Sequence, residues 1–576
     1  MRFESDVLSK CIKFERDPKP DKVLGHWTIT GSYNADIKSV PSLYKEVERF
    51  QLRLETKLKK YPDICTGFNE QIFKRIKNNN FSFYEDILKK HPEIASYQKV
   101  YSPVNYSLKS DSINTSVRPC VNMGFCPDPA FPSLNDCMFT GPSLNLPIQQ
   151  ITLKMRQYKE FGISDINNFY QSCHLSLRDK ALNLMLFREN GWGKPGEIKT
   201  LLSNRLNYGS RHSQFLANKC KLLTSEEYIL PISNNAHELL KSSMTDDVFV
   251  GHFNRDEMIK LSEIMTTGLL KANFVLKDWS FSRQCNKEVQ LGPPGLNEES
   301  QGTLGLVWFP LEDVWKIKSN ICLAPKRRGA KDPYFIITDM NKARELFEKY
   351  GVSRRAALRI SHSFYDPNSL FIQLKTNKHL LYRKLIRICP DLPWDDLIPT
   401  SLHPEWLQVI KMTLECSNIK IPRFCMYGCA DLTAELGLFA DGSKECSSCR
   451  IFIRYKNSDN QYNSNYLTGS SKLAAPGSES APHTECEAAL MSLRLAATVK
   501  ETLNDISITG YHLFSDSTIT LGGITGNSCT QKLFYSLRNF SSAKLVDELK
   551  VKLWLCSSEN QEADIGSKLD LNIRDI

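Results

Sequence analysis

Two separate sets of acidic residues constrain the fold of this chain more than any other feature. The first set is Asp165, in the context Ile163-Ser164-Asp165-Ile166, and the adjacent pair Asp246-Asp247, which the apolar run 248–250 follows. The apolar neighbours predict strands, and two adjacent aspartates are costly to hold together without a cation. The pattern predicts a sheet that brings Asp165 beside a hairpin carrying the pair. The simpler alternative is that the pair caps a turn.

The second set lies near the C-terminus and consists of Asp441, Glu485, Asp516 and Asp564. Carboxylate oxygens are the ligands that Mg²⁺ prefers, and two metal ions about 3.5–4 Å apart can activate one oxygen and stabilise another during phosphoryl transfer. Each acidic set therefore has the composition of a two-metal site. The alternative for the second set is that its members are surface acids on ordinary turns.

Composition limits the choice of protein class. A chain of 576 residues has room for about three or four domains, and its hydrophobic content of 41% is enough for large cores. The net charge of +10 suits a polyanionic partner, although any slightly basic protein would show it. The sequence has no apolar stretch of membrane-spanning length and no signal-peptide core at Met1. We therefore expect an intracellular, cytoplasmic protein.

Four of the 18 cysteines have the paired spacing of a zinc ribbon: Cys425, Cys429, Cys446 and Cys449. Asp441 and Gly442 lie between the two pairs, in what reads as a strand and its turn. A hairpin of another domain accounts for the same segment. We predict that these cysteines do not bind zinc.

The hydrophobic pattern divides the chain into four regions. Residues 1–100 read as a charged, helical lead-in. Within the second region, 101–330, residues 146–280 alternate helix-like and strand-like runs, which is typical of an α+β core. The third region, 331–428, is mainly helical from 338 to 388, and the fourth, 429–576, contains a second α/β pattern over residues 430–570. The overall prediction is an α+β multidomain fold.

Short motifs follow one another along nearly the whole chain, at residues 118–122, 132–137, 164–171, 207–217, 244–247, 304–308 and 364–367. In this order they resemble the reverse transcriptase of BEL/Pao-type LTR retrotransposons. The segments 438–443, 484–490, 514–518 and 562–567 resemble the RNase H domain of the same elements. Each motif is weak alone, but the ordered series is specific.

The resemblance implies a right-hand polymerase with fingers and palm in 101–330, a thumb and connection in 331–428, and an RNase H-like domain in 429–576. It implies an RNA-directed DNA polymerase, a nucleotidyltransferase, that also has ribonuclease H activity. The implied partners are an RNA template, a DNA primer, the RNA–DNA hybrid and dNTPs. The implied cofactor is Mg²⁺, with Mn²⁺ as the alternative, at two ions per active site. Such a protein would be part of a polyprotein in cytoplasmic virus-like particles; its oligomeric state stays open.

The resemblance also assigns metal ligands. Asp165 and Asp246 would be the main ligands of the polymerase site, and Asp247 would assist them. The nuclease ligands would be Asp441, Glu485, Asp516 and Asp564. Within its motif Glu485 has a rival, Glu487, which would point to a different side of the helix.

Substrate-binding residues follow from the same resemblance. Lys109 and Arg118 would bind the triphosphate, Tyr170 would crowd the sugar 2′ position or simply pack in the core, and Tyr208 and Gly209 would floor the nucleotide pocket. Five further residues are expected to contact nucleic acid, with core packing or solvated charge as the alternatives: Trp308, Lys326, Arg327, Arg328 and Lys331.

Three positions depart from the family pattern. Met244 replaces a tyrosine, Asn122 an aspartate and Gln214 a proline. No proposed metal ligand is lost. These departures keep two other hypotheses open: a domesticated or decayed element protein that binds nucleic acid without synthesis, and a nuclease with a structural polymerase remnant.

Overall fold

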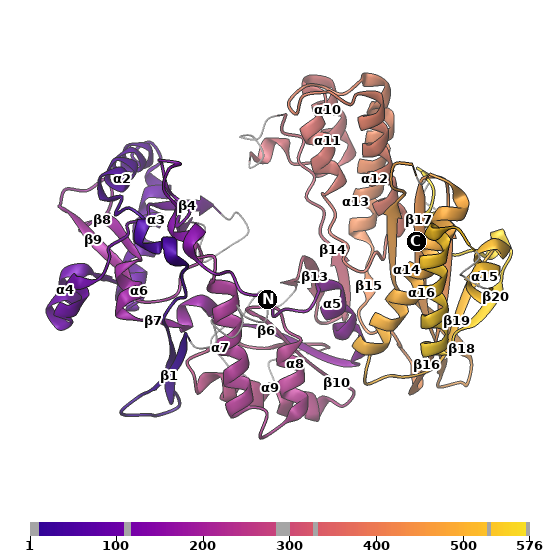
Figure 1. The fold of residues 1–576 in the computed structure, drawn as a ribbon, viewed down its shortest axis with the longest axis horizontal. Helices are drawn as coiled ribbons and strands as arrows, with labels where there is room; N and C mark the ends of the chain where they lie inside the picture. Colours follow the sequence, from indigo (N-terminus) through magenta and orange to yellow (C-terminus); the bar gives the residue numbers. More distant parts are fainter. Residues whose placement is uncertain are drawn as a thin grey trace.

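The computed structural model describes residues 11–108, 117–283, 300–325, 332–477, 479–526 and 531–571. Figure 1 shows four parts: an N-terminal part at one end, a central sheet backed by helices, a helical bundle, and a C-terminal domain next to the bundle. Within these described residues, no helix is long and apolar enough to cross a membrane.

The N-terminal part mixes strands and helices, which corrects the expectation of a helical lead-in. A hairpin of β1 and β2 comes first, and β2 pairs with β7 in parallel. Strand β3 pairs with β9, so that Phe81 lies opposite Ser203. The helices need these later strands, because the buried face of α2 packs on β8. The elements are β1 Ile12–Arg16, β2 Gly25–Ile29, α2 Tyr44–Leu58, α3 Pro62–Lys77, β3 Phe81–Phe83, α4 Tyr84–Lys90, β4 Val104–Leu108, β5 Val117–Val121, β7 His174–Leu175, α6 Leu177–Ala181, β8 Leu184–Arg188 and β9 Ile198–Ser203.

The central sheet has three antiparallel strands in the order β10-β6-β11. Its middle strand β6 is buried along most of its length, as its apolar residues predict. Helices α7, α8 and α9 cover it, and α5 precedes it in the chain. The bounds are α5 Ile148–Gln157, β6 Glu160–Asp165, α7 Ser213–Tyr228, α8 Asn234–Lys241, β10 Asp247–His252, α9 Arg255–Leu270 and β11 Ser280–Phe281.

A four-stranded sheet, β12-β13-β14-β15, leads into the helical bundle. The bundle helices pack in pairs, α10 with α13 and α11 with α12. In the described part of residues 331–428 the one strand is β15, so no separate connection sheet lies there. The bounds are β12 Gln301–Thr303, β13 Leu306–Phe309, β14 Val314–Ile317, α10 Met340–Tyr350, α11 Arg354–Ser361, α12 Ile372–Ile388, α13 His403–Asn418 and β15 Ile421–Pro422.

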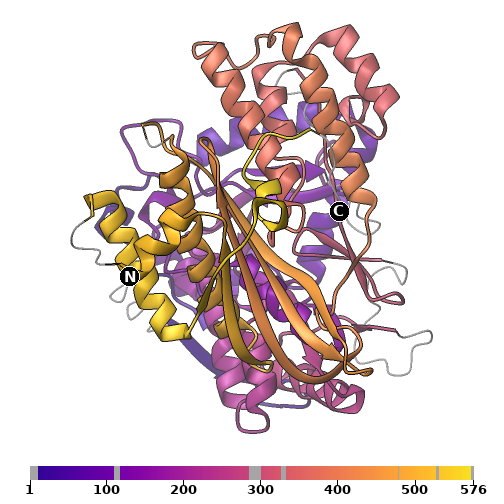
Figure 2. The ribbon, with the colours of Figure 1, turned by 90° about the vertical axis from the view of Figure 1, so that its right-hand side faces the viewer.

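The C-terminal domain is a five-stranded sheet in the order β18-β17-β16-β19-β20, with α14 and α16 packed together. Strands β16, β17 and β18 are antiparallel, whereas β19 and β20 run parallel to β16. The predicted second α/β region is thus confirmed, and Figure 2 shows its long strands side by side below the bundle. The bounds are β16 Cys429–Gly442, β17 Cys446–Asn457, β18 Tyr462–Leu473, α14 Ala481–Thr502, β19 Ser507–Ser515, α15 Thr518–Thr525, α16 Leu533–Leu549 and β20 Lys552–Leu555.

Helix α5 fastens the C-terminal domain to the central part through buried polar contacts. The Arg156 guanidinium donates to the Leu467 carbonyl at 2.6 Å. The Asp505 carboxylate accepts from Gln157 Nε2 at 2.6 Å and from the Tyr158 hydroxyl at 2.7 Å. Since buried polar groups are costly to leave unpaired, these contacts fix the C-terminal domain on the central part.

Candidate active sites

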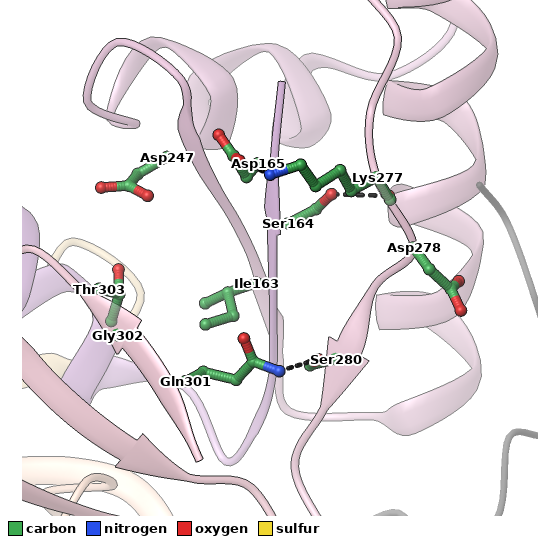
Figure 3. Close-up of a pocket in the computed structure, with 10 residues that line it drawn as sticks. All are labelled: Ile163, Ser164, Asp165, Asp247, Lys277, Asp278, Ser280, Gln301, Gly302 and Thr303. Carbon is green, nitrogen blue, oxygen red and sulfur yellow. Dashed lines mark hydrogen bonds and ion pairs between the residues drawn. The ribbon is translucent and has the colours of Figure 1, made fainter. Parts of the chain in front are cut away.

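The first carboxylate set meets at one end of the central sheet. Asp165 ends β6, Asp247 begins β10, and the two lie directly opposite each other in the antiparallel register. Asp246 belongs to the turn before β10, where its carbonyl accepts from the Ile166 amide at 2.8 Å. Figure 3 shows Asp165 and Asp247 at the same end of the neighbouring strands. The strand register therefore brings Asp165 beside Asp246 and Asp247, as the sequence predicts.

The turn that carries Asp246 has an unusual backbone. It closes through a hydrogen bond of 2.9 Å from the Asp247 amide to the Met244 carbonyl. Thr245 has a φ of 48°, in the left-handed region that a β-branched residue rarely adopts. Its hydroxyl donates to the Asp246 carboxylate at 2.9 Å. The turn thus stores strain next to the carboxylates.

The electrostatics of this centre favour a cation. Burial raises the pKa of Asp247 to about 7, and the charges of Asp246 and Asp165 push it in the same direction. The Lys277 ammonium forms an ion pair with the Asp165 carboxylate. The backbone amide of Lys277 also donates to the backbone carbonyl of Asp165 at 2.9 Å. Carboxylates that repel one another within a short distance match the oxygen donor set of a divalent ion. The residues therefore fit a metal site.

A second lysine lies beneath the same turn. The ammonium of Lys221, from α7, donates to the Thr245 carbonyl at 2.8 Å. Burial lowers the pKa of Lys221 to about 7, while the charges of Asp246 and Asp247 oppose that shift. Neither Lys221 nor Lys277 could be assigned from sequence, since no motif links them to the aspartates.

Two of the expected nucleotide-binding residues, Tyr170 and Tyr208, lie near these carboxylates. The rings of Tyr170 and Tyr208 stand edge to face, with centroids 5.1 Å apart. Burial raises the pKa of Tyr170, and Asp246 adds to the shift, so the half-buried ring lies near that carboxylate. Gly209 packs on β5 so closely that a Cβ would lie 1.9 Å from the Val121 carbonyl oxygen. Only glycine fits there.

Two arginines flank the tyrosines. Arg118 is exposed on β5, and Lys109 lies outside the described residues. Burial raises the pKa of Tyr208, and the charges of Arg75 and Arg118 oppose this shift, so both cations lie near its ring. Arg75 comes from the last turn of α3, 5.4 Å above the Phe81 ring. The sequence reading missed Arg75 because it assigned α3 to a separate lead-in.

The expected nucleic-acid contact of Trp308 is corrected by its burial. This side chain is 0% exposed, and its indole N–H donates to the Asp313 carboxylate at 3.0 Å. It also packs edge to face on Phe161. Trp308 is therefore a core residue. The four basic residues of the predicted contact loop lie outside the described residues: Lys326, Arg327, Arg328 and Lys331.

The second carboxylate set gathers at the ends of two parallel strands. Asp441 lies near the end of β16, and Asp516 directly follows the neighbouring strand β19. Glu485 lies in the first turns of α14 and accepts from the Ser517 hydroxyl at 2.6 Å. Asp564 begins a short 3₁₀ helix after β20. Parallel strands end at the same edge of a sheet, and this topology brings the four acids to one edge.

Asp441 lies at the middle of this second centre. Burial raises its pKa, the charges of Asp516 and Asp564 add to the shift, and Ser567 and Lys568 oppose it. Lys568 forms an ion pair with Asp564. The buried Oδ2 of Asp441 has no hydrogen-bond partner within the described residues, and a buried unpaired acceptor is costly. Such an oxygen fits a metal ligand, although no three acidic, histidine or cysteine side chains are arranged to hold an ion as they stand in the part of the chain described.

Glu485 and Glu487 take different directions, as the helix geometry predicts. Glu487 forms ion pairs with Arg538 at 2.5 Å and with Lys472 at 2.8 Å. Glu485 instead points to Ser517, next to Asp516. The contacts of Glu487 are those of a structural residue.

The four cysteines with zinc-ribbon spacing are far apart. Cys429 lies opposite Asn457, whereas Cys449 lies opposite Ala440 at the other end of the β16–β17 hairpin. These positions are separated by on the order of 30 Å along the strand. The four thiols therefore cannot share one metal ion.

Residues 353–517 match the family model described as the Pao retrotransposon-like RNaseH-like domain. This match confirms the resemblance to BEL/Pao-type elements for that part of the chain. No curated protein matches the chain.

Similar solved structures include two complexes of the foamy viral protease-reverse transcriptase. The complex with an RNA/DNA hybrid is 13% identical, covers 100% of this chain and 63% of its own, and gives a TM-score of 0.48. The complex with dsDNA is 13% identical, covers 96% of this chain and 92% of its own, with the same TM-score of 0.48.

Proposed function

We propose that the chain is an RNA-directed DNA polymerase with ribonuclease H activity. The observation that carries the proposal is the meeting of Asp165, Asp246 and Asp247 on two paired strands, near the ring of Tyr170. A strand aspartate beside a hairpin pair is the arrangement that two-metal phosphoryl transfer needs. The N-terminal part would then act as fingers, the central sheet as palm and the bundle as thumb.

In the polymerase centre the three aspartates would hold two divalent ions. Bound there, the ions would activate the primer 3′-hydroxyl and stabilise the leaving pyrophosphate. Arg118 and the nearby Arg75 offer planar cations to the triphosphate. Tyr170 would exclude a 2′-hydroxyl by contact with the sugar, which selects deoxynucleotides.

In the nuclease centre Asp441, Glu485, Asp516 and Asp564 would hold the metal ions that activate water against an RNA phosphodiester. Ser517 orients Glu485 by its hydrogen bond. The unpaired Oδ2 of Asp441 is the acceptor that a bound ion would satisfy. Recognition of the hybrid would rest on backbone shape and 2′-hydroxyl groups.

The test is a pair of assays on one preparation. The first is extension of a labelled DNA primer on an RNA template, and the second is cleavage of labelled RNA in a hybrid, each with Mg²⁺, with Mn²⁺ and with EDTA. We expect both activities with either metal and neither with EDTA. Cleavage without extension would identify a nuclease with a polymerase remnant. Hybrid binding without either activity would identify a nucleic-acid-binding protein.

A further inference from the structure

Lys221 is a buried cation that the proposed mechanism does not use. Its side chain is 2% exposed, in the middle of α7. Its ammonium donates to the Thr245 carbonyl at 2.8 Å, reaches the Ser243 carbonyl at 3.5 Å, and lies 5.7 Å from the centre of the Phe169 ring. Both acceptors are main-chain carbonyls, and they stand on either side of Met244.

This arrangement is costly for folding. Removing an ammonium from water carries a large penalty, and its hydrogen bonds to two carbonyls offset only part of that penalty. A methionine has nearly the length of lysine and would fill the same space without a charge. The position of Lys221 therefore needs a reason other than core packing.

The reason lies in the turn that Lys221 contacts. The two carbonyls belong to the segment that enters the turn of residues 244–247, where Thr245 holds its left-handed φ of 48°. Asp246 directly follows the held carbonyl of Thr245, and the Asp246 carbonyl in turn accepts from Ile166, next to Asp165. A change at Thr245 would therefore pass directly to Asp246 and to its distance from Asp165.

We propose that Lys221 is a positioning residue of the polymerase centre: by its hydrogen bonds to the two carbonyls it holds the strained turn so that Asp246 faces Asp165. This inference rests on the proposed function of that centre. Lys277 neutralises Asp165 from the β11 side, whereas Lys221 acts from below through the backbone.

The test replaces Lys221 by methionine and uses a second buried lysine as a matched control. Lys378, in α12, is 1% exposed and donates to the Ser363 hydroxyl at 3.3 Å. It lies in the helical bundle and not in the central sheet that carries Asp165 and Asp247. We expect Lys221→Met to lower kcat for single-nucleotide addition by about tenfold or more, as does loss of a residue that supports metal ligands. Because Lys221 would act on the metal ligands and not on substrate binding, the KM for dNTP and the Kd for hybrid should stay within about twofold of wild type. The rate of RNA cleavage should also stay within about twofold. Lys378→Met should leave kcat unchanged, and Lys221→Arg should restore part of it.

A second readout needs no turnover. In an Asp441→Asn background, which removes the central ligand of the other centre, Mn²⁺ should raise the melting temperature less for Lys221→Met than for Lys221. If Lys221→Met does not fold, Lys221→Leu, which also lacks a hydrogen-bond donor, decides the question by the same measurements.

The outcomes separate the two proposals. A wild-type protein that does not extend primers overturns the proposed function, and the Mn²⁺ shift then shows whether Lys221 still supports a metal site. Wild-type kcat and an unchanged Mn²⁺ shift in a folded Lys221 variant would overturn the positioning role. Equal losses in Lys221→Met and Lys378→Met would do so as well, because they would show a general cost of removing a buried lysine.

Discussion

The two carboxylate centres of this chain are assembled in different ways. The polymerase centre draws its three aspartates from one strand and one tight turn, held opposite each other by strand register. The nuclease centre draws its four acids from a strand end, a helix, a loop and a 3₁₀ turn. The first depends on pairing between two neighbours, whereas the second depends on the order of the whole five-stranded sheet.

The charges around the two centres also differ. The polymerase aspartates have a lysine in contact with Asp165 and another beneath the backbone of Thr245. The nuclease acids have Lys568 on Asp564 at the rim, and hydroxyl groups from Ser517 and Ser558 on Glu485 and Asp516. In the polymerase centre, a substitution beneath the turn should move Asp246 and so lower polymerase activity. In the nuclease centre the acids lie on separate elements, so a substitution should affect only the acid that it replaces or contacts.

Replacing one proposed metal ligand in each centre should separate the two activities most clearly. Asp165→Asn should abolish primer extension and leave hybrid cleavage, and Asp441→Asn should do the reverse. Each loss should reach about 10³-fold, since the metal contribution of several kcal/mol corresponds to a factor of ten per 1.4 kcal/mol. Both assays are run on each variant. Loss of both activities in a folded Asp441→Asn protein would show that the centres are not independent.

Neighbouring glutamates on α14 sharpen the assignment of the nuclease centre. Glu485→Gln should reduce cleavage by on the order of 10²-fold, because the lost carboxylate faces Asp516. Glu487→Gln breaks the ion pairs with Arg538 and Lys472, and should change cleavage by less than about threefold, as expected for partly exposed pairs. Cleavage rates at saturating hybrid measure the difference. The reverse order of the two variants would mean that the helix face is misassigned.

Much of both centres follows from the sequence, because local context fixes it. The apolar flanks of Asp165 and the run after Asp247 predict paired strands, and the order of motifs gives the RNase H-like set. The direction of Glu485 against Glu487 follows from helix geometry alone. Such features need only short-range information.

Other features could not be predicted, because they depend on distant contacts. Lys277 meets Asp165 across 112 positions, and Arg75 reaches Tyr208 from a helix that the sequence assigned to a lead-in. The sequence left Trp308 open between core packing and nucleic-acid contact, and packing against the neighbouring strands and Phe161 decides for the core. The pairing of β15 with β14 could not be predicted either, since a helical run followed by a strand does not show which sheet the strand joins.

Sugar selection tests the environment of the polymerase aspartates. Tyr170→Ala should raise ribonucleotide use relative to deoxynucleotide use by on the order of tenfold, because removing a steric contact in a pocket changes discrimination by about 1–3 kcal/mol. Tyr170→Phe keeps the ring and should keep the selection. Competition assays with both nucleotide types measure the ratio. Unchanged discrimination in Tyr170→Ala would return this ring to a packing role beside Tyr208.

The smallest expected effect is the pH dependence of folding stability that arises from His212, a residue near the polymerase centre. His212 precedes α7, the helix that carries Lys221, and is 2% exposed. Burial lowers its pKa from 6.5 to about 4. Below pH 6.5 the unfolded chain therefore binds a proton at this position that the folded chain does not bind. The stability of the fold is complete above pH 6.5 and falls as the pH drops from 6.5 toward 4. At pH 5.5 the loss from His212 should be about 1 kcal/mol, from one pH unit at 1.36 kcal/mol.

His212→Gln removes this titration. The free energy of unfolding should then fall by about 1 kcal/mol less between pH 7.5 and 5.5 than it does in the wild type. Denaturant unfolding at each pH measures it, and the values at pH 7.5 serve as the internal reference for the cost of the substitution itself. In the wild type, primer extension should decline on acidification before hybrid cleavage does, because proton uptake by His212 requires opening of the structure at the start of α7, the helix beneath the Asp246 turn. An identical slope in wild type and variant would show that acid destabilisation arises elsewhere, and a parallel decline of both activities would show that the two centres lose their structure together.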